Sequence, residues 1–420
     1  MLELTLSADL DVLIVGARVA GSSLAILLGR QGRRVLLVDR DHFPSDTLST
    51  HLLAPPAVAA LAQLGVLADV EASGLRRLVR ARSYVGECVL EGPMMPVPPG
   101  YGLAPRRDRL DWILIRHATA HPTVTFQERT RAVGLLRDGE RVVGAVLQDA
   151  QGHRREVRAR AVVGADGKNS DVARWVQAPA YEEVPPLRPG YYGYYRDVTP
   201  LLDPTLELFF VGDHIGFIFP MEPGIDCLAM EITPEEFETF RKEPRQAFET
   251  RFREFPGMER RLRNATLDGR IMGIRGVENY FRTPFGPGWA LTGDAAYCKD
   301  PSTGLGIGDA FTQAFLLAEA IASGLDGDWA RELADYHKAR DAMLMPLYQV
   351  TLSFTKAPPV PPESLDALHA VLSSPGLART LAIGFAPTVQ SSPAFTERER
   401  GMIEMFARAF AARRIHGHQG

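Results

Sequence analysis

The chain has 420 residues, of which 45% are hydrophobic and 23% charged, and this length and composition predict a folded protein of more than one structural lobe. A net charge of −4 gives no reason to expect a nucleic-acid or acidic-membrane partner. The three cysteines lack metal-ligand or redox spacing, no apolar run is long enough to cross a bilayer, and the first residues are acidic, unlike a secretory signal. We therefore expect a cytoplasmic protein without a metal site or an integral membrane segment.

The first predicted elements are a strand, a helix and a second strand. Val12–Val15 and Val35–Val38 are apolar runs typical of strands buried on both faces, and the residues from Ala20 to Leu28 have helical spacing. The connecting stretch GARVAG, residues 16–21, is similar to the glycine fingerprint whose N–H groups and helix dipole face a pyrophosphate. Gly16 permits the tight turn out of the strand, and Gly21 permits close packing of the helix on the sheet.

Arg18 occupies the place of the middle glycine of that fingerprint. Two interpretations have equal weight: a cation that borders the diphosphate, or a solvated arginine on an exposed turn. Asp39 ends the second strand, where an acid accepts hydrogen bonds from the ribose hydroxyls of an adenosine and disfavours a 2′-phosphate. This position favours a nucleotide role for Asp39 over a capping or loop role.

The rest of the chain divides into helical, meander and sheet patterns. Helices are predicted within residues 51–70 and 106–121, and a small antiparallel meander within 124–160. Residues 181–270 are rich in Tyr and Pro and contain alternating stretches such as GYYGYYRDV and HIGFIFP, which predict an antiparallel sheet in a second lobe. A polar helix should follow this sheet, and the chain after residue 330 is predicted to be helical.

Two further motifs make the functional interpretation specific. They are VVGADGKNSDVAR, residues 162–174, and WALTGDAAYCKDPSTGLGIGDA, residues 289–310. GARVAG and these two motifs follow one another in the order typical of one family. On these three motifs, the chain resembles the FAD-dependent monooxygenase superfamily of the p-hydroxybenzoate hydroxylase fold over about residues 10–330. That superfamily also contains geranylgeranyl-type reductases and flavin-dependent halogenases. Three residues depart from the family pattern: Arg18, Ala173 (beside Arg174), and Tyr297, which stands where a histidine is common.

The resemblance implies an α/β fold with a discontinuous Rossmann-like FAD-binding domain, an antiparallel-sheet substrate lobe and a helical C-terminal region. The FAD-binding domain would consist of residues 1–80, 101–180 and 271–330. The substrate lobe would consist of residues 81–100 and 181–270, and the helical region of residues 331–420.

The resemblance also implies roles for individual residues around a bound FAD. The residues at the pyrophosphate and the adenosine would be Gly16, Ala17, Arg18, Ala20, Gly21, Asp39, Arg40 and, through its backbone, Val133. Those at the ribityl chain, the flavin ring and the passage of NAD(P)H would be Thr50, Arg107, Asp166, Gly167, Gly293, Asp294, Pro301, Gly304, Leu305 and Gly306. The segment that contains the last four would bring backbone amides and a helix N-terminus towards the N1–C2=O edge, which is negative in reduced flavin. Arg106 and Arg109 are expected to be surface charges.

The resemblance favours a monooxygenase of secondary metabolism that hydroxylates a hydrophobic, aromatic or polyketide-like small molecule. Such enzymes reduce FAD with NAD(P)H and transfer oxygen from O2 through a flavin C4a-hydroperoxide. The candidate substrate-binding residues are the lobe aromatics Tyr192, Tyr194, Phe210, Phe217 and Phe219, although each could simply be part of the sheet core. His51, expected near the flavin ring, is either a proton donor or, preferably, a hydrogen-bonding wall residue.

Three alternatives stay open beside the monooxygenase. A reductase of isoprenoid-type double bonds is favoured by the third motif and by the FIFP strand, and disfavoured by the loop 43–56, which lacks a cysteine. A halogenase is less consistent with the sequence, because the strand GFIFP has no W-x-W-x-I-P pattern. A partner-binding protein without FAD is disfavoured by Asp39, Asp166 and Asp294. A homo-oligomer is compatible with all of these readings.

Overall fold

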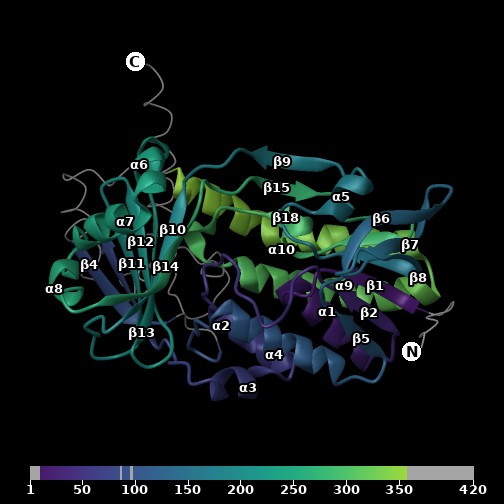
Figure 1. Ribbon diagram of the computed structural model, residues 1–420, viewed down its shortest axis with the longest axis horizontal. Coiled ribbons are helices and arrows are strands. Elements are labelled where there is room, and N and C mark those ends of the chain that lie inside the picture. The colour runs from purple at the N-terminus through teal and green to yellow at the C-terminus, as the bar shows by residue number, and fades with distance from the viewer. Residues whose placement is uncertain (1–9, 86–87, 95–97, 357–420) are drawn as a thin grey trace, which may run out of the picture.

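The computed structural model describes residues 10–85, 88–94 and 98–356. It contains a nucleotide-binding-type α/β domain and a second lobe built on a separate sheet, at opposite ends of the molecule (Figure 1). This arrangement confirms the expected α/β class. The predicted helices after residue 356 and parts of the segment 81–100, at 86–87 and 95–97, lie outside the described residues.

The first sheet has eight strands and is centred on β1 (Leu10–Val15). β1 pairs in parallel with β2 (Val35–Val38) and β8 (Arg154–Gly164). The order β16-β17-β8-β1-β2-β5 is completed by β5 (Val124–Gln127), β16 (Phe285–Gly286) and β17 (Trp289–Leu291). The predicted meander is the antiparallel series β6 (Arg131–Asp138), β7 (Arg141–Gln148) and β8.

Alternate residues of β1 contact different layers, as the apolar runs predict for a strand buried on both faces. Val12 and Ile14 pack against the helices, whereas Leu13 and Val15 pack against the meander. The helical layer contains α1 (Val19–Arg30), α2 (Pro55–Gln63), α3 (Leu67–Ala72), α4 (Arg107–Thr119) and α9 (Gly306–Asp326). The meander side also includes α5 (Asp171–Trp175) and the one-turn η2 (Gly293–Ala295).

The second lobe is a seven-stranded sheet with the order β14-β10-β13-β12-β11-β3-β4. Its strands are β3 (Arg80–Val85), β4 (Cys88–Pro93), β10 (Gly190–Arg196), β11 (Thr205–Val211), β12 (His214–Pro220), β13 (Ile225–Glu231) and β14 (Thr266–Ile274). The pairs are antiparallel as expected, with one exception: β11 and β3 run parallel. β14 continues the lobe beyond the expected limit at residue 270.

The two faces of the lobe sheet have different coverings. One face is covered by α6 (Phe237–Lys242) and α7 (Pro244–Arg253), which contribute phenylalanines, and by α8 (Met258–Arg261); all three follow the short η1 (Pro234–Glu236). The single polar helix expected here is therefore interrupted, because Pro244 begins a new helix instead of continuing the first. The other face carries Tyr192, Phe217 and Phe219 and is turned towards the α/β domain.

A third, three-stranded sheet connects these parts: β18 (Tyr297–Cys298), β15 (Asn279–Arg282) and β9 (Ala180–Val184). It lies beside the long helix α10 (Trp329–Thr355), with η3 (Pro301–Thr303) between β18 and α9 (Figure 1). Arg340 of α10 is fully buried and donates to the carbonyl of Arg282, which fixes this helix to the sheet. Among the described residues, none of the helices combines the length and apolarity needed to span a membrane.

Candidate functional site

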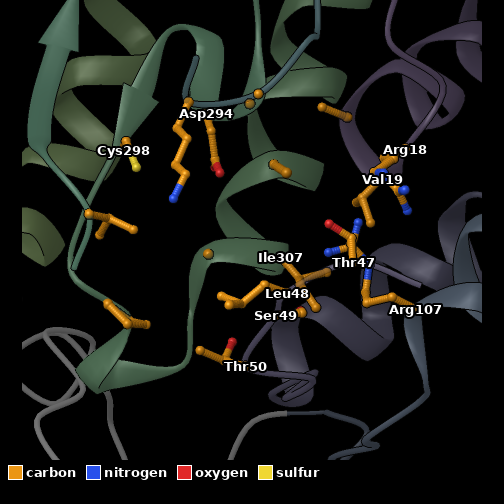
Figure 2. Close-up of a pocket in the computed structure, with 18 of the residues that line it drawn as sticks. Arg18, Val19, Thr47, Leu48, Ser49, Thr50, Arg107, Asp294, Cys298 and Ile307 are labelled. Atoms are coloured by element: carbon orange, nitrogen blue, oxygen red, sulfur yellow. The ribbon is translucent and has the colours of Figure 1, made fainter. Parts of the chain in front are cut away.

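A cavity of about 500 Å³ lies between the α/β domain and the lobe. Its walls come from the turn after β1, the loop from Asp39 to Thr50, the start of α9 and the lobe face that carries Tyr192. Figure 2 shows the loop residues Thr47 to Thr50 beside Ile307, with Arg18 and Arg107 at one side. Segments from distant parts of the chain therefore share one cavity, which no single motif could have revealed.

The turn after β1 admits only glycine at its two key positions. Gly16 has a φ of 107°, and a Cβ there would lie 2.3 Å from the carbonyl oxygen of Ala165. A Cβ on Gly21 would lie 1.8 Å from the carbonyl oxygen of Gly16, so α1 can approach the strand this closely only without a side chain. These contacts give a physical basis for both glycines of the first motif.

Asp39 fixes the same turn from the end of β2. Its carboxylate accepts hydrogen bonds from the backbone N–H of Ala17 at 2.7 Å and of Asp41 at 2.9 Å, and the side chain lines the cavity. Burial raises the pKa of this carboxyl, although the two N–H donors oppose that shift. Asp39 thus orders the turn, and it is also in the position expected for a ribose ligand.

Two helices begin at the cavity without a capping side chain. Arg18, the N-cap of α1, and Leu305, the N-cap of α9, make no side-chain capping bond within the described part of the chain. Val19 and Gly306, the first residues of these helices, both line the cavity. Unpaired N–H groups and the positive ends of two helix dipoles therefore face the same space, which suits phosphate and a negatively charged ring edge.

Arg18 is bound into a network of buried charges. Its guanidinium donates to Asp111 at 2.9 Å and to Asp41 at 2.9 Å, and its carbon atom lies 5.3 Å from the centre of the Phe43 ring. Arg107 donates to the same Asp111 carboxylate, which has no exposed surface. With 22% of its side chain exposed, Arg18 does not match the solvated-arginine interpretation; it lines the cavity.

Two acids from the other motifs also line the cavity. Asp166 accepts from the Ser170 hydroxyl at 2.5 Å and from the backbone N–H of Asp171 at 2.8 Å, so it organises the start of α5. Asp294 is exposed to the cavity while protein surrounds it on its other sides, and burial raises the pKa of its carboxyl. Of these two acids, Asp294 is the more accessible to a bound molecule.

Most of the predicted cofactor residues line this cavity. Those that do are Gly16, Arg18, Ala20, Asp39, Arg40, Thr50, Arg107, Asp166, Gly167, Gly293, Asp294, Pro301, Gly304 and Gly306. Those that do not are Ala17, Gly21, Val133 and Leu305. At the meander, the lining residues are Arg131 and Ala132 instead of Val133. A bulge between Ala132 and Gly134 shifts the pairing of β6 with β7 at this point.

Only some of the predicted aromatic residues of the lobe line the cavity. Tyr192, Phe217 and Phe219 line the cavity, and Tyr192 and Phe217 both pair with Ala229, so they lie on either side of that small residue. Phe210 instead packs edge-on against Phe354 of α10, with ring centres 5.1 Å apart. Tyr194 lies beneath Arg106 and does not line the cavity.

Arg106 corrects the expectation of a surface charge. Its guanidinium carbon lies 4.1 Å from the centre of the Tyr194 ring, and it donates to Asp268 at 2.8 Å. Only 20% of its side chain is exposed. Because Tyr194 and Asp268 belong to the lobe, Arg106 connects the two parts of the protein. Arg109, with 44% of its side chain exposed, matches the expected surface position.

His51 is fully buried and does not line the cavity. Its Nε2 hydrogen bonds with the Tyr194 hydroxyl at 2.7 Å, and its Nδ1 lies 3.9 Å from the Cys227 sulfur. Burial, with the nearby Arg107 and Arg106 charges, lowers its pKa to about 3. His51 therefore lies behind the cavity wall, where it makes the hydrogen bond expected of it but does not face a bound molecule.

Several cavity residues were missed by sequence reasoning. The most notable are polar and buried: Glu231, Lys299, Asp300, Asp309 and Gln313. Lys299 and Asp309 form an ion pair of 2.6 Å that joins the residue after β18 to the first turn of α9. The alternating pattern of β13 could have indicated Glu231. Ile225, Cys227 and Ala229 lie on one face of this strand, and the next position on that face is an acid.

The cavity residues fit FAD. Gly167 and Gly306 leave open space at the cavity wall, because a Cβ on either would meet no atom of the described residues within 4 Å. Uncapped helix N-termini suit the pyrophosphate and the ring edge, Asp39 suits the ribose, and the aromatic wall suits an adjacent apolar molecule.

Comparisons with known proteins agree with this fit. A sequence model of a family described as FAD binding domain matches residues 9–351. A menaquinone reductase of Mycobacterium tuberculosis is 30% identical over 347 residues, which cover 77% of this chain and 80% of that protein. A pyrrole-2-carbonyl carrier-protein brominase of Pseudoalteromonas luteoviolacea is 28% identical over 332 residues, covering 76% and 79%.

Two monooxygenase-type proteins are also similar. The 6-methylpretetramide 4-monooxygenase of Streptomyces rimosus is 32% identical over 180 residues, covering 42% of this chain and 43% of that protein. The crystal structure of Pseudomonas aeruginosa PqsL in complex with 2-aminobenzoylacetate has a TM-score of 0.70 at 26% identity, covering 83% of this chain and 95% of that one. The chain therefore belongs to the FAD binding domain family, and it is an FAD-dependent oxidoreductase of the p-hydroxybenzoate hydroxylase-fold superfamily.

Proposed function

We propose that this protein is a monooxygenase that hydroxylates a hydrophobic, aromatic or polyketide-like small molecule with O2 and NAD(P)H. The observation that carries the proposal is the continuity of the cavity from the turn at Gly16 to the aromatic wall at Phe217. A dinucleotide held at one end would leave apolar space at the other. The similarity to the 6-methylpretetramide monooxygenase supports the same substrate class.

The chain's own residues would bind the cofactor and the substrate, orient them towards each other and exclude water from the cavity. The chemistry that bound flavin would supply is the reaction with O2. The N-terminus of α9 at Gly306 would stabilise negative charge on the ring edge, because its N–H groups lack side-chain caps. Tyr192, Phe217 and Phe219 would exclude water and hold a flat substrate against the cofactor.

A reductase that acts on a quinone or on an isoprenoid double bond is the second candidate. It is favoured by the menaquinone reductase, which is 30% identical over 77% of this chain. The cavity suits both substrates, because each has an extended apolar part. The two functions differ in what the substrate gains: one oxygen atom from O2, or two hydrogen atoms.

The deciding experiment mixes anaerobically reduced, FAD-loaded enzyme rapidly with buffer containing ¹⁸O2 and follows the flavin absorbance. The substrates are a set of phenols, naphthols and anthrones, tested in parallel with menaquinone and geranylgeranyl compounds. We expect faster reoxidation with one of the aromatic compounds, and mass spectrometry should detect ¹⁸O in its product. Reduction of the quinone or alkene without ¹⁸O incorporation would replace the proposal with the reductase.

A parallel reaction with added bromide tests the activity named for the similar brominase. A brominated product in place of the hydroxylated one would contradict the monooxygenase. The matched control for all reactions is the Asp39→Ala variant, in which loss of FAD should abolish every product.

A further inference from the structure

Glu231 is an acid on the apolar, cavity-facing side of the lobe sheet. It is the last residue of β13, where it pairs with Gly190 of β10 and Ile215 of β12. Two residues earlier on the same face, Ala229 lies between Tyr192 and Phe217 of the aromatic wall. Because Gly190 has no side chain, the carboxyl of Glu231 is placed directly at the end of this wall.

No hydrogen-bond donor among the described residues reaches either carboxyl oxygen of Glu231. The side chain is only 3% exposed, and it lines the cavity. An ionised carboxylate buried without a partner is strongly disfavoured, so the group has to be satisfied in another way. Such an acid is retained most readily when a ligand supplies the missing hydrogen bond.

Asp300 of the α/β domain faces Glu231 within hydrogen-bonding reach. Its Oδ1 accepts from the backbone N–H of Ser302 at 3.0 Å and from the Thr355 hydroxyl at 3.2 Å, whereas its Oδ2 has no partner in the described chain. Burial raises the pKa of the Asp300 carboxyl, and these two donors oppose that shift by favouring its anion. Burial and that anion raise the pKa of Glu231 well above its usual value.

One proton shared by the two acids would remove the cost of burying two anions side by side. In that arrangement an O–H of Glu231 would donate to Oδ2 of Asp300, so that the donating oxygen and Oδ2 would both have a partner. The carbonyl oxygen of Glu231 is then an unused acceptor at the end of the aromatic wall. A ligand carbonyl has no proton to offer this oxygen, whereas a hydroxyl group does.

We propose that Glu231, paired with Asp300, binds a hydroxyl group on the aromatic ring of the substrate and thereby determines which ring carbon faces the cofactor. The ligand class is a phenol or enol, with the hydroxyl at Glu231 and the ring against Tyr192 and Phe217. The inference rests on the proposed function insofar as it places the substrate in this cavity. It concerns binding and not turnover.

The test measures binding to oxidised, FAD-loaded enzyme by isothermal calorimetry at pH 7. The probes are 1-naphthol and 1-fluoronaphthalene, which have similar size but differ in the donor. Because a hydrogen bond to a buried polar group changes affinity by about tenfold, wild-type enzyme should bind 1-naphthol about tenfold more tightly. Equal affinities, or no binding of either probe, would overturn the proposal.

Two variants identify Glu231 as the source of the preference. Glu231→Gln should keep the preference for 1-naphthol over 1-fluoronaphthalene, because the amide N–H can donate to Asp300 and the amide oxygen remains an acceptor. Glu231→Leu should remove it while leaving the affinity for 1-fluoronaphthalene unchanged, which also shows that the pocket is intact. If Glu231→Leu retains the naphthol preference, the proposal is wrong.

The outcome is separable from that of the monooxygenase test. A naphthol preference that depends on Glu231, without ¹⁸O incorporation into any product, would refute the monooxygenase and keep the hydroxyl site. Hydroxylation of a substrate, together with naphthol binding that does not depend on Glu231, would support the monooxygenase and refute the hydroxyl site.

Discussion

Arg18 donates a hydrogen bond of 2.9 Å to the fully buried carboxylate of Asp111, a residue 93 positions later in the chain. The same carboxylate accepts from Arg107, so one acid of α4 joins the dinucleotide turn to the start of that helix. The substitution of the middle glycine by arginine is therefore matched by a specific partner. It makes the turn part of a buried charge network at the edge of the cavity.

Replacement of Arg18 by alanine should destabilise the protein. The fully buried Asp111 would lose a charged donor, and a hydrogen bond to a charged group contributes about 1.5–3 kcal/mol, whereas the bond to Asp41, whose side chain is 41% exposed, contributes little. We expect the free energy of unfolding to fall by about 1.5–3 kcal/mol, measured by urea unfolding of the FAD-loaded enzyme. FAD affinity should fall as well, since Arg18 lines the cavity.

Arg40→Ala is the matched control. Arg40 also lines the cavity, but 70% of its side chain is exposed. Its replacement should change stability by less than about 0.5 kcal/mol. Equal losses of stability in the two variants would mean that the Asp111 network does not hold the turn.

Gly306→Ala should separate FAD binding from folding. A Cβ at this position would meet no atom within 4 Å, so the protein itself can accept it. The methyl group would nevertheless project into the cavity at the start of α9, where we place the flavin edge. We expect unchanged stability of the flavin-free protein and FAD binding that is weaker by about tenfold, or about 1.4 kcal/mol.

Gly308→Ala tests whether that effect is local. Its added Cβ would lie 3.5 Å from the Cβ of Ala57, an ordinary contact, and Gly308 does not line the cavity. Fluorescence titration of FAD should therefore give the wild-type dissociation constant for this variant. If both alanine variants bind FAD like wild type, the ring edge does not lie at the start of α9.

The motif positions could be predicted from the sequence because local geometry determines them. Gly16 leaves no space for a Cβ, and Asp39 ends a buried strand next to the turn it orders. Such contacts recur wherever the same strand–turn–helix forms. The apolar runs of β1 and β2 likewise determine burial on both faces, whatever the rest of the chain does.

Long-range partners could not be predicted in this way. The sequence contains nothing that pairs Arg18 with Asp111, or that places Arg106 over Tyr194. Similarly, one bulge in β6 decides that Ala132 lines the cavity and Val133 does not. The parallel pairing of β11 with β3 also depends on tertiary packing, because an alternating strand fits either direction.

Asp39→Ala should abolish the retention of FAD through gel filtration. The variant would lose the acceptor for the backbone N–H of Ala17 as well as the expected ribose contact. Asp39→Asn keeps one side-chain oxygen as an acceptor, so its flavin content should be intermediate. The measurement is the ratio of flavin to protein absorbance, and wild-type flavin content in Asp39→Ala would contradict the assigned role.

Protonation of His51 should make the protein sensitive to acid. Its pKa is lowered to about 3 in the folded state, chiefly by burial, whereas an unfolded histidine titrates near 6.5. Between these values the unfolded chain binds more protons than the folded one, so stability falls as the pH falls. From pH 8 to pH 5 the loss should be about 2 kcal/mol, because the full slope of about 1.4 kcal/mol per pH unit applies only below pH 6.5.

His51→Asn tests this origin, because asparagine tolerates the φ of 62° at this position and does not titrate. At pH 8 the variant should be less stable than wild type, having lost the ring contacts with Tyr192 and Tyr194. Its deficit should shrink by about 2 kcal/mol at pH 5, as the wild type loses stability and the variant does not. A deficit for His51→Asn that is the same at both pH values would mean that the folded state does not lower the pKa of His51, and it would restore this histidine as a candidate proton donor.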